Sequence, residues 1–169
     1  AAPGGKATYI AQRMEDRGRV VASDLDPERL QLVEENKKRL GTSSIQIVPM
    51  SELLKTTDLY DRILLDVPWS NTGVLRRRVD LRWRIRQDEI TSLAGEQLRL
   101  GILYSRRLRP GGTLVYSTCS LEPDENERIV ARLGKEVPSL KVEQPWSSFP
   151  PESGMDGAFV AKFKLDRSK

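Results

Sequence analysis

The chain has 169 residues, of which 38% are hydrophobic and 31% are charged, with a formal net charge of +4. This balance is typical of a soluble globular domain with a buried core, and no apolar run approaches the ~18 residues that a membrane-spanning helix needs. One cysteine and no histidine exclude an internal disulfide and leave no zinc site. We expect a single domain over residues 1–169, without metal or membrane contact, in the reducing cytoplasm.

The chain opens on a glycine loop, Ala1-Ala2-Pro3-Gly4-Gly5-Lys6, and a helix-like stretch follows from Ala7 to about Glu15. A glycine pair before a helix lets backbone N–H groups approach an anionic or polar ligand. A Walker phosphate loop is excluded, because it needs a glycine five residues before the Gly-Lys pair and a Ser or Thr where Ala7 stands. The loop is therefore a candidate site for a cofactor of another kind.

The next run, residues 19–24, is β-rich and ends at Asp24. An acid at the tip of the strand that follows a glycine loop is well placed to accept both hydroxyls of a ribose. A helix is predicted over residues 27–40, because Asp26 can cap its first turn and Gly41 stops it.

Two further strands are predicted over residues 45–48 and 62–66, and the second of them ends at Asp66. The long polar loop 67–87 follows, with arginines crowded around Trp83. Arginine forks bind phosphates, and an interleaved tryptophan adds a stacking surface for bases. Taken alone, such a loop is more often a solvated basic surface.

A helix is predicted from Asp88 to about Leu108, and the turn Arg109–Gly112 separates it from a strand over residues 112–117. Cys119 lies just past the carboxyl end of that strand, where an open α/β sheet presents groups to a ligand. It is a candidate nucleophile, although a lone free cysteine is more often an inert buried side chain.

A helix over residues 124–134 and strands near residues 139–143 and 157–165 complete the pattern. Strands alternate with helices, without repeats or linkers. Such alternation predicts a doubly wound α/β fold with a mainly parallel sheet and its ligand at the carboxyl ends of the strands. Because three strand tips carry polar groups, we expect them to line one crevice.

Together these motifs resemble those of the RNA cytosine-5 methyltransferases, the family of the RsmB, Sun, Fmu and NSUN type. The segment Ala1–Lys6 resembles the family's S-adenosylmethionine loop without its leading cysteine. Asp24 matches the family's ribose-binding acid, Asp66 the catalytic acid of its Asp-x-Pro-Cys motif, and Cys119 the nucleophile of its Ser-Thr-Cys-Ser motif. The resemblance continues, in the family's order, through Thr72-Gly73-Val74, Asp80-Leu81-Arg82-Trp83, Pro110-Gly111-Gly112, Glu122–Glu127 and Asp156–Ala161.

The resemblance implies a Rossmann-like methyltransferase fold and catalysis by Cys119, which adds to carbon 6 of a cytosine while Asp66 holds N3. The implied partner is RNA, first of all 16S ribosomal RNA, bound by a monomer. Beside a base-modifying site, the arginine loop is expected to contact that RNA through Arg76, Arg77, Arg78, Arg82 and Trp83. S-adenosylmethionine is expected at Ala1, Ala2, Pro3, Gly4, Gly5, Lys6, Asp24 and Asp66.

Three departures from the family qualify this expectation. Trp69 replaces the second cysteine of the family, which assists release of the product, so the sequence supports methyl addition better than turnover. The chain begins inside the cofactor loop, so the family's first strand is expected to be missing from an amino-terminally truncated domain. Only Glu52 lies near the family's acid after the third strand, and the contact to adenine is left open.

Two alternatives stay open. The segment Asp66-Val67-Pro68-Trp69 is similar to the Asp-Pro-Pro-aromatic motif of amino-methyltransferases, whose chemistry needs no cysteine. That alternative leaves the segment Tyr116–Ser120 unexplained. The other is an inactive fragment or a non-catalytic RNA-binding module, because the first strand is expected to be missing.

Overall fold

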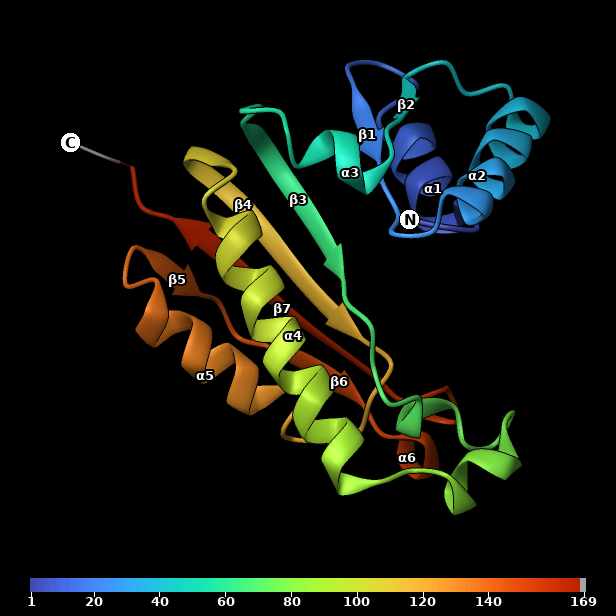
Figure 1. Ribbon diagram of the computed structural model, residues 1–169, viewed down its shortest axis with the longest axis vertical. Helices are drawn as coiled ribbons and strands as arrows, with labels where there is room; N and C mark the ends of the chain where they lie inside the picture. Colours follow the sequence, from blue (N-terminus) through green and yellow to red (C-terminus); the bar gives the residue numbers. More distant parts are fainter. Residues whose placement is uncertain (168–169) are drawn as a thin grey trace. The chain divides into compact units, whose positions relative to one another are not determined.

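The computed structural model describes residues 1–167 and divides the chain into two compact units, residues 1–57 and residues 58–169. Each unit has its own sheet, its own helices and its own hydrophobic core (Figure 1). The prediction of a single domain stays a prediction.

The first unit is built on two short parallel strands, β1 (Val20–Ala22) and β2 (Ile45–Ile47). The helices α1 (Gly5–Arg13) and α2 (Pro27–Leu40) pack on these strands and on each other, and a short helix, α3 (Met50–Leu53), follows β2 (Figure 1). Its buried core consists of Ala7, Ala11, Ala22, Leu30, Val33 and Ile45.

The ends of α2 follow the signals in its sequence. The Asp26 side chain accepts a hydrogen bond from the Glu28 backbone N–H at 2.9 Å, and Gly41 ends the helix in the left-handed conformation, with φ 65°. Helix α1 begins two residues before the predicted position, because Gly4, at φ 108°, already turns the chain into it.

The second unit is a five-stranded mixed sheet. Its strands run in the order β3 (Tyr60–Asp66), β4 (Leu108–Thr118), β7 (Ala158–Leu165) and β5 (Leu140–Val142), and β6 (Trp146–Ser148) also pairs with β7. Strands β3 and β4 are parallel, whereas β7 is antiparallel to β4, β5 and β6. The α/β class is thus as predicted, and β7 makes the sheet mixed because short connections join β5, β6 and β7.

Two long helices, α4 (Gln87–Ser105) and α5 (Glu127–Glu136), lie side by side over this sheet (Figure 1). A short helix, α6 (Pro150–Ser153), precedes β7, and the loop after β3 contains the 3-10 helices Thr72–Val74 and Val79–Trp83. The core between helices and sheet includes Leu98, Leu114, Tyr116, Ile129, Leu133, Phe159 and Phe163.

The predicted turn Arg109–Gly112 lies inside β4 rather than before it. Leu108 pairs with Tyr60 and Thr113 pairs with Arg62, so the turn forms an irregularity between two paired stretches. Gly111 has φ 73°, a conformation that glycine adopts without strain, and the strand continues past the turn to Thr118.

Candidate active site

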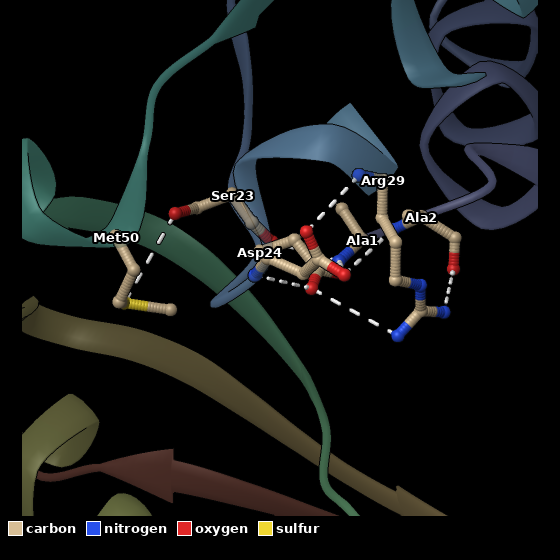
Figure 2. A network of polar contacts seen from close by, with 7 residues as sticks. Ala1, Ala2, Ser23, Asp24, Arg29 and Met50 are labelled. Carbon is tan, nitrogen blue, oxygen red and sulfur yellow. Dashed lines mark hydrogen bonds and ion pairs between the residues drawn. The ribbon is translucent and has the colours of Figure 1, made fainter. Parts of the chain in front are cut away.

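In the first unit, the glycine loop is tied to the acid that follows β1. The Ala1 amine donates to Asp24 Oδ2 at 2.7 Å and to the Ser23 carbonyl at 2.7 Å. The Ala2 backbone N–H donates to the same Asp24 oxygen at 3.0 Å. Figure 2 shows Asp24 facing Ala1, Ala2 and Arg29, whose guanidinium donates to the Ala2 carbonyl at 3.2 Å. The loop and the acid are therefore brought together.

The Asp24 carboxylate is ionised and well hydrogen-bonded. Its side chain is 13% exposed, and its Oδ1 accepts the Asp26 backbone N–H at 3.2 Å. Burial by itself raises the pKa of Asp24, but the hydrogen bonds that its carboxylate accepts, including those from the Ala2 and Asp26 backbone N–H groups, outweigh burial and lower the pKa. A carboxylate offers about four lone-pair positions. Three of them accept these N–H groups, so a second hydroxyl on Asp24 would have to displace one of these donors.

Gly4 is required where it stands in the loop. Its φ of 108° disfavours other residues, and a Cβ there would lie 3.2 Å from the Cα of Val33 on α2. The Pro3 carbonyl accepts a hydrogen bond from Asn36 of the same helix at 3.0 Å. Close packing on α2 therefore determines the course of the loop, while Lys6 is exposed.

In the second unit, Asp66 and Cys119 lie at the carboxyl ends of two adjacent parallel strands. Asp66 pairs in register with Ser117, whose hydroxyl donates to Asp66 Oδ1 at 3.0 Å. Cys119 follows two residues later and is partly exposed. The structure thus brings together the two residues predicted to be catalytic.

The residues directly before and after Cys119 are both hydrogen-bonded to the side chain of Asn126. The Thr118 hydroxyl donates to Asn126 Oδ1 at 2.6 Å, and Asn126 Nδ2 donates to the Ser120 carbonyl at 2.9 Å. Asn126 is 4% exposed. Cys119, the candidate nucleophile, therefore lies between two residues whose hydrogen-bond partners are fixed.

The turn Thr72–Val74 packs against the segment that contains Cys119. The Gly73 backbone N–H donates to the Cys119 carbonyl at 3.0 Å, and the Thr72 hydroxyl accepts the Leu121 backbone N–H at 2.8 Å. A Cβ at residue 73 would meet the Gly157 carbonyl and would lie 2.5 Å from the Cys119 carbonyl oxygen. Glycine is needed here for close approach of two backbones.

Two buried polar residues behind these loops escaped the sequence analysis. Gln97 and Glu125 are both 0% exposed. Gln97 stands within the apolar inward stripe of α4, and a polar residue at such a position was the available signal. For Glu125 no signal existed beyond its place in the segment Glu122–Glu127.

Trp69 occupies the loop after Asp66 and is partly buried. Its indole nitrogen is buried and has no hydrogen-bond partner within residues 1–167. The side chain is a weak donor without basicity, so it cannot take the proton that a cysteine at this position could take. Its role stays a prediction.

The predicted RNA-contacting residues divide into two groups. Arg76 and Arg77 contact Asp156 at 2.7 Å and 2.9 Å, and these arginines, first of all the hydrogen bond from Arg76, lower the pKa of Asp156. Arg78 and Arg82 are exposed, and Trp83 is 84% exposed. The side chains of Arg76 and Arg77 are exposed as well, at 49% and 68%, so the two groups differ in their contact with Asp156.

In the part of the chain that the structure describes, no three His, Cys, Asp or Glu side chains gather as metal ligands would. No helix there combines the length and the apolar character needed to cross a membrane.

Comparisons with known proteins agree with one another. The family model for 16S rRNA methyltransferase RsmB/F matches residues 1–164. The ribosomal RNA small subunit methyltransferase B of Vibrio vulnificus is 41% identical over 170 residues, which cover 95% of this chain and 40% of that protein. The chain thus spans about two fifths of the length of the curated relative.

Solved structures share the fold over almost the whole chain. The structure of NSun6 from Pyrococcus horikoshii with SFG is 33% identical, with a TM-score of 0.89, and the match covers 99% of this chain and 47% of that one. A methyltransferase homolog protein from Pyrococcus horikoshii is 29% identical, with a TM-score of 0.85, over 98% of this chain and 59% of that one.

Proposed function

The chain belongs to the RsmB/F family of S-adenosylmethionine-dependent RNA cytosine-5 methyltransferases, and from this premise we propose that it methylates carbon 5 of a cytosine in 16S ribosomal RNA. The observation that carries the proposal is the pair Asp66 and Cys119 at the ends of β3 and β4. We place the reaction in the cytoplasm, where ribosomal RNA and a reduced thiol occur together.

The first unit fits S-adenosylmethionine through its glycine loop. Gly4 and Gly5 open α1, whose first backbone N–H groups and helix dipole favour a polar ligand. The ionised Asp24 can accept ribose hydroxyls once one of its N–H donors is exchanged. When bound, S-adenosylmethionine supplies the methyl group as a positively charged sulfonium.

In the second unit, the reaction begins with the Cys119 thiolate. It adds to carbon 6 of the cytosine and moves an electron pair to carbon 5. Carbon 5 could then take the methyl group that a bound S-adenosylmethionine would supply, with the bonding pair left on the sulfur. N3 of the ring takes a proton from solvent during this addition and returns it on elimination, and the Asp66 carboxylate stabilises the protonated form by a hydrogen bond. Loss of the carbon 5 proton to a solvent base then restores the ring double bond and expels the Cys119 thiolate.

The exposed part of the arginine loop supports contact with RNA. Arg78 and Arg82 offer guanidinium groups to phosphates, and Trp83 offers a ring on which a base can stack. The target cytosine has to be unstacked before Cys119 can reach carbon 6. Arg76 and Arg77 pair with Asp156 and stay exposed, so they remain candidates for contact with RNA as well.

The test is an analysis of the product. The full-length protein is incubated with 16S ribosomal RNA and S-adenosylmethionine, and the RNA is digested to nucleosides for mass spectrometry. We expect 5-methylcytidine with the wild type and none above background with Cys119→Ser, whose thermal unfolding should match the wild type. Formation of N4-methylcytidine that survives in Cys119→Ser would overturn the proposal in favour of the amino-methyltransferase alternative.

A further inference from the structure

The second unit contains an acid that the proposed reaction does not use. Glu125 is 0% exposed, and no lysine or arginine of residues 1–167 pairs with it. A buried carboxylate without a cation persists only where hydrogen bonds satisfy its oxygens. Glu125 therefore has to be explained by the groups that donate to it.

Four donors from three segments converge on this carboxylate. Its Oε1 accepts the Ser70 backbone N–H at 3.0 Å and Gln97 Nε2 at 2.9 Å. Its Oε2 accepts the hydroxyl of Ser70 and, at 2.5 Å, the hydroxyl of Ser120. Ser70 lies four residues after Asp66, and Ser120 comes directly after Cys119, so one side chain holds both loops.

Two buried residues next to Glu125, Gln97 and Tyr116, make further hydrogen bonds in the same network. Gln97 Nε2 also donates to the Pro68 carbonyl at 2.8 Å, and Gln97 Oε1 accepts the Tyr116 hydroxyl at 3.1 Å. The single proton of that hydroxyl is shared with the Glu125 carbonyl, which is the nearer acceptor at 2.6 Å. Burial, and then the charge of Glu125, raises the pKa of Tyr116 far above its usual value, so the phenol stays a donor.

We infer that Glu125 is a positioning residue, whose carboxylate holds the loop after Asp66 against the segment of Cys119 and so sets the distance between the two catalytic side chains. The inference rests on the proposed function. Glu125 is enclosed and both of its oxygens are occupied, so it acts through Ser70 and Ser120 and not on the base itself. A displacement of about 1 Å between reacting groups can lower a rate by about 100-fold.

The two matched substitutions are Glu125→Gln and Glu125→Leu. A glutamine can keep all four contacts, because its carbonyl accepts from Ser70 N–H and Gln97 while its NH2 group donates to the Ser70 and Ser120 hydroxyls, which can also accept. A leucine fills the space but removes the acceptor that the four donors share, and with it the link between the two loops. The comparison therefore separates the geometry of the network from its charge.

The measurement is the steady-state kinetics of cytosine methylation by the full-length protein. We expect Glu125→Gln to keep kcat within about threefold and to keep the pH profile of kcat, whereas Glu125→Leu lowers kcat by about 100-fold. The KM for S-adenosylmethionine should change by less than about twofold in both, since the loss falls on the reacting step. Should Glu125→Leu not fold, Ser120→Ala removes the hydroxyl through which Glu125 holds the Cys119 segment, together with the contacts of that hydroxyl to Thr72 and to the Glu122 N–H. We expect it to lower kcat by about tenfold.

Unchanged kcat in Glu125→Leu, or in Ser120→Ala where the leucine variant does not fold, would overturn the inference. A Glu125→Gln variant as slow as Glu125→Leu would also overturn it, because the charge and not the network would then matter. A wild type that makes no 5-methylcytidine would instead contradict the proposed function, so the two failures are distinguishable.

Discussion

Asp24 and Glu125 each hold a loop at the end of a strand, but they do so in different ways. Asp24, 13% exposed, is held by the Ala1 amine and backbone N–H groups, with Arg29 at 4.0 Å. Glu125, 0% exposed, is held by one backbone N–H, an amide and two hydroxyls. The first arrangement is open to ligands and to salt, whereas the second is closed to both.

If the proposed function holds, this difference predicts different roles for Asp24 and Glu125. A partly exposed carboxylate can exchange its donors for those of a bound ligand, which suits a residue that binds a cofactor. A buried and satisfied network cannot exchange donors at low cost, which suits residues that must keep a fixed geometry. Five measurements test this comparison.

The largest effect is expected at Asp24, whose hydrogen-bond donors can be exchanged for those of a ligand. Asp24→Ala should weaken S-adenosylmethionine binding by on the order of 2–4 kcal/mol, because two charge-assisted hydrogen bonds to the ribose are lost. Calorimetry measures the affinity. Asp26→Ala is the control, since it removes a helix cap, costs about 1 kcal/mol of stability and leaves that affinity unchanged. Equal affinity in Asp24→Ala and the wild type would show that Asp24 only supports the loop.

Gly73 tests the close packing of the Thr72–Val74 turn against the Cys119 segment. Gly73→Ala forces a Cβ against two backbone carbonyls, so we expect a loss of about 1–3 kcal/mol in unfolding free energy and about 100-fold in kcat. Gly95→Ala is the control, because nothing lies within 4 Å of a Cβ at that position of α4. It should be neutral or stabilise the protein by up to about 1 kcal/mol. A Gly73→Ala variant that behaves like this control would refute the tight contact with Cys119.

Trp69 tests whether the fixed geometry also permits release of the product. Wild type should accumulate a covalent complex with unmodified cytosine RNA, visible as a slow band on a denaturing gel. Trp69→Cys should weaken that band and raise turnover by about tenfold or more, because a thiolate can take a proton. Trp146→Cys, at an exposed tryptophan of β6, controls for the added thiol. Free turnover of the wild type without a complex would mean that release does not need a cysteine at position 69 and that this interpretation of Trp69 is wrong.

Arg82 is an exposed charged residue, unlike the largely buried Asp24 and Glu125, and it tests the predicted contact with RNA. Arg82→Ala should weaken RNA binding by about 1 kcal/mol and reduce the slope of log K against log salt by about 0.7, the value for one phosphate contact to a single strand. Fluorescence anisotropy over a salt series measures both quantities. Arg132→Ala, at an exposed arginine of α5, is the control. An unchanged salt slope in Arg82→Ala would remove this residue from the RNA contact.

The smallest effect concerns the stability of the protein in acid, at the partly exposed Asp16. The Ser43 hydroxyl, followed by backbone N–H groups of Ser44 and Ser43, holds the pKa of Asp16 far below its usual value. A lowered pKa in the folded state means a contribution to stability that is present above about pH 4 and is lost as the pH falls below it. Asp16→Asn, which tolerates the positive φ of 55° at this position, should flatten the acid limb of the stability curve. If Asp16→Asn and the wild type lose stability identically as the pH falls, Asp16 does not contribute to the stability in this way.

Local signals predicted much of the fold. Asp26, Pro27 and Gly41 define α2 at the predicted residues, because caps and breakers act within one turn. The helices α3 and α6 and the strand β6 were not predicted, since elements of three or four residues carry no measurable periodicity. The turn Arg109–Gly112 was read as an end of structure, and only pairing with β3 shows that the strand continues through it.

The candidate site was predicted in its parts but not in its connections. Strand-end placement identified Asp66 and Cys119, because an apolar run followed by a polar residue is visible in the sequence. The partners of Glu125 come from positions 28 and 55 residues away, and Arg76 meets Asp156 80 residues along the chain. Such pairings depend on how the strands and helices pack, which no local pattern specifies.

The central claim is that Cys119 forms a covalent bond with its substrate, and trapping that bond tests it most directly. The full-length protein is incubated with S-adenosylmethionine and RNA that contains 5-fluorocytidine, whose fluorine cannot leave as a proton does. Intact-mass and peptide-mapping mass spectrometry should find one RNA adduct, bonded at Cys119 and absent in Cys119→Ser. The absence of an adduct in the wild type, together with 5-methylcytidine formed by Cys119→Ser on ordinary RNA, would contradict the account.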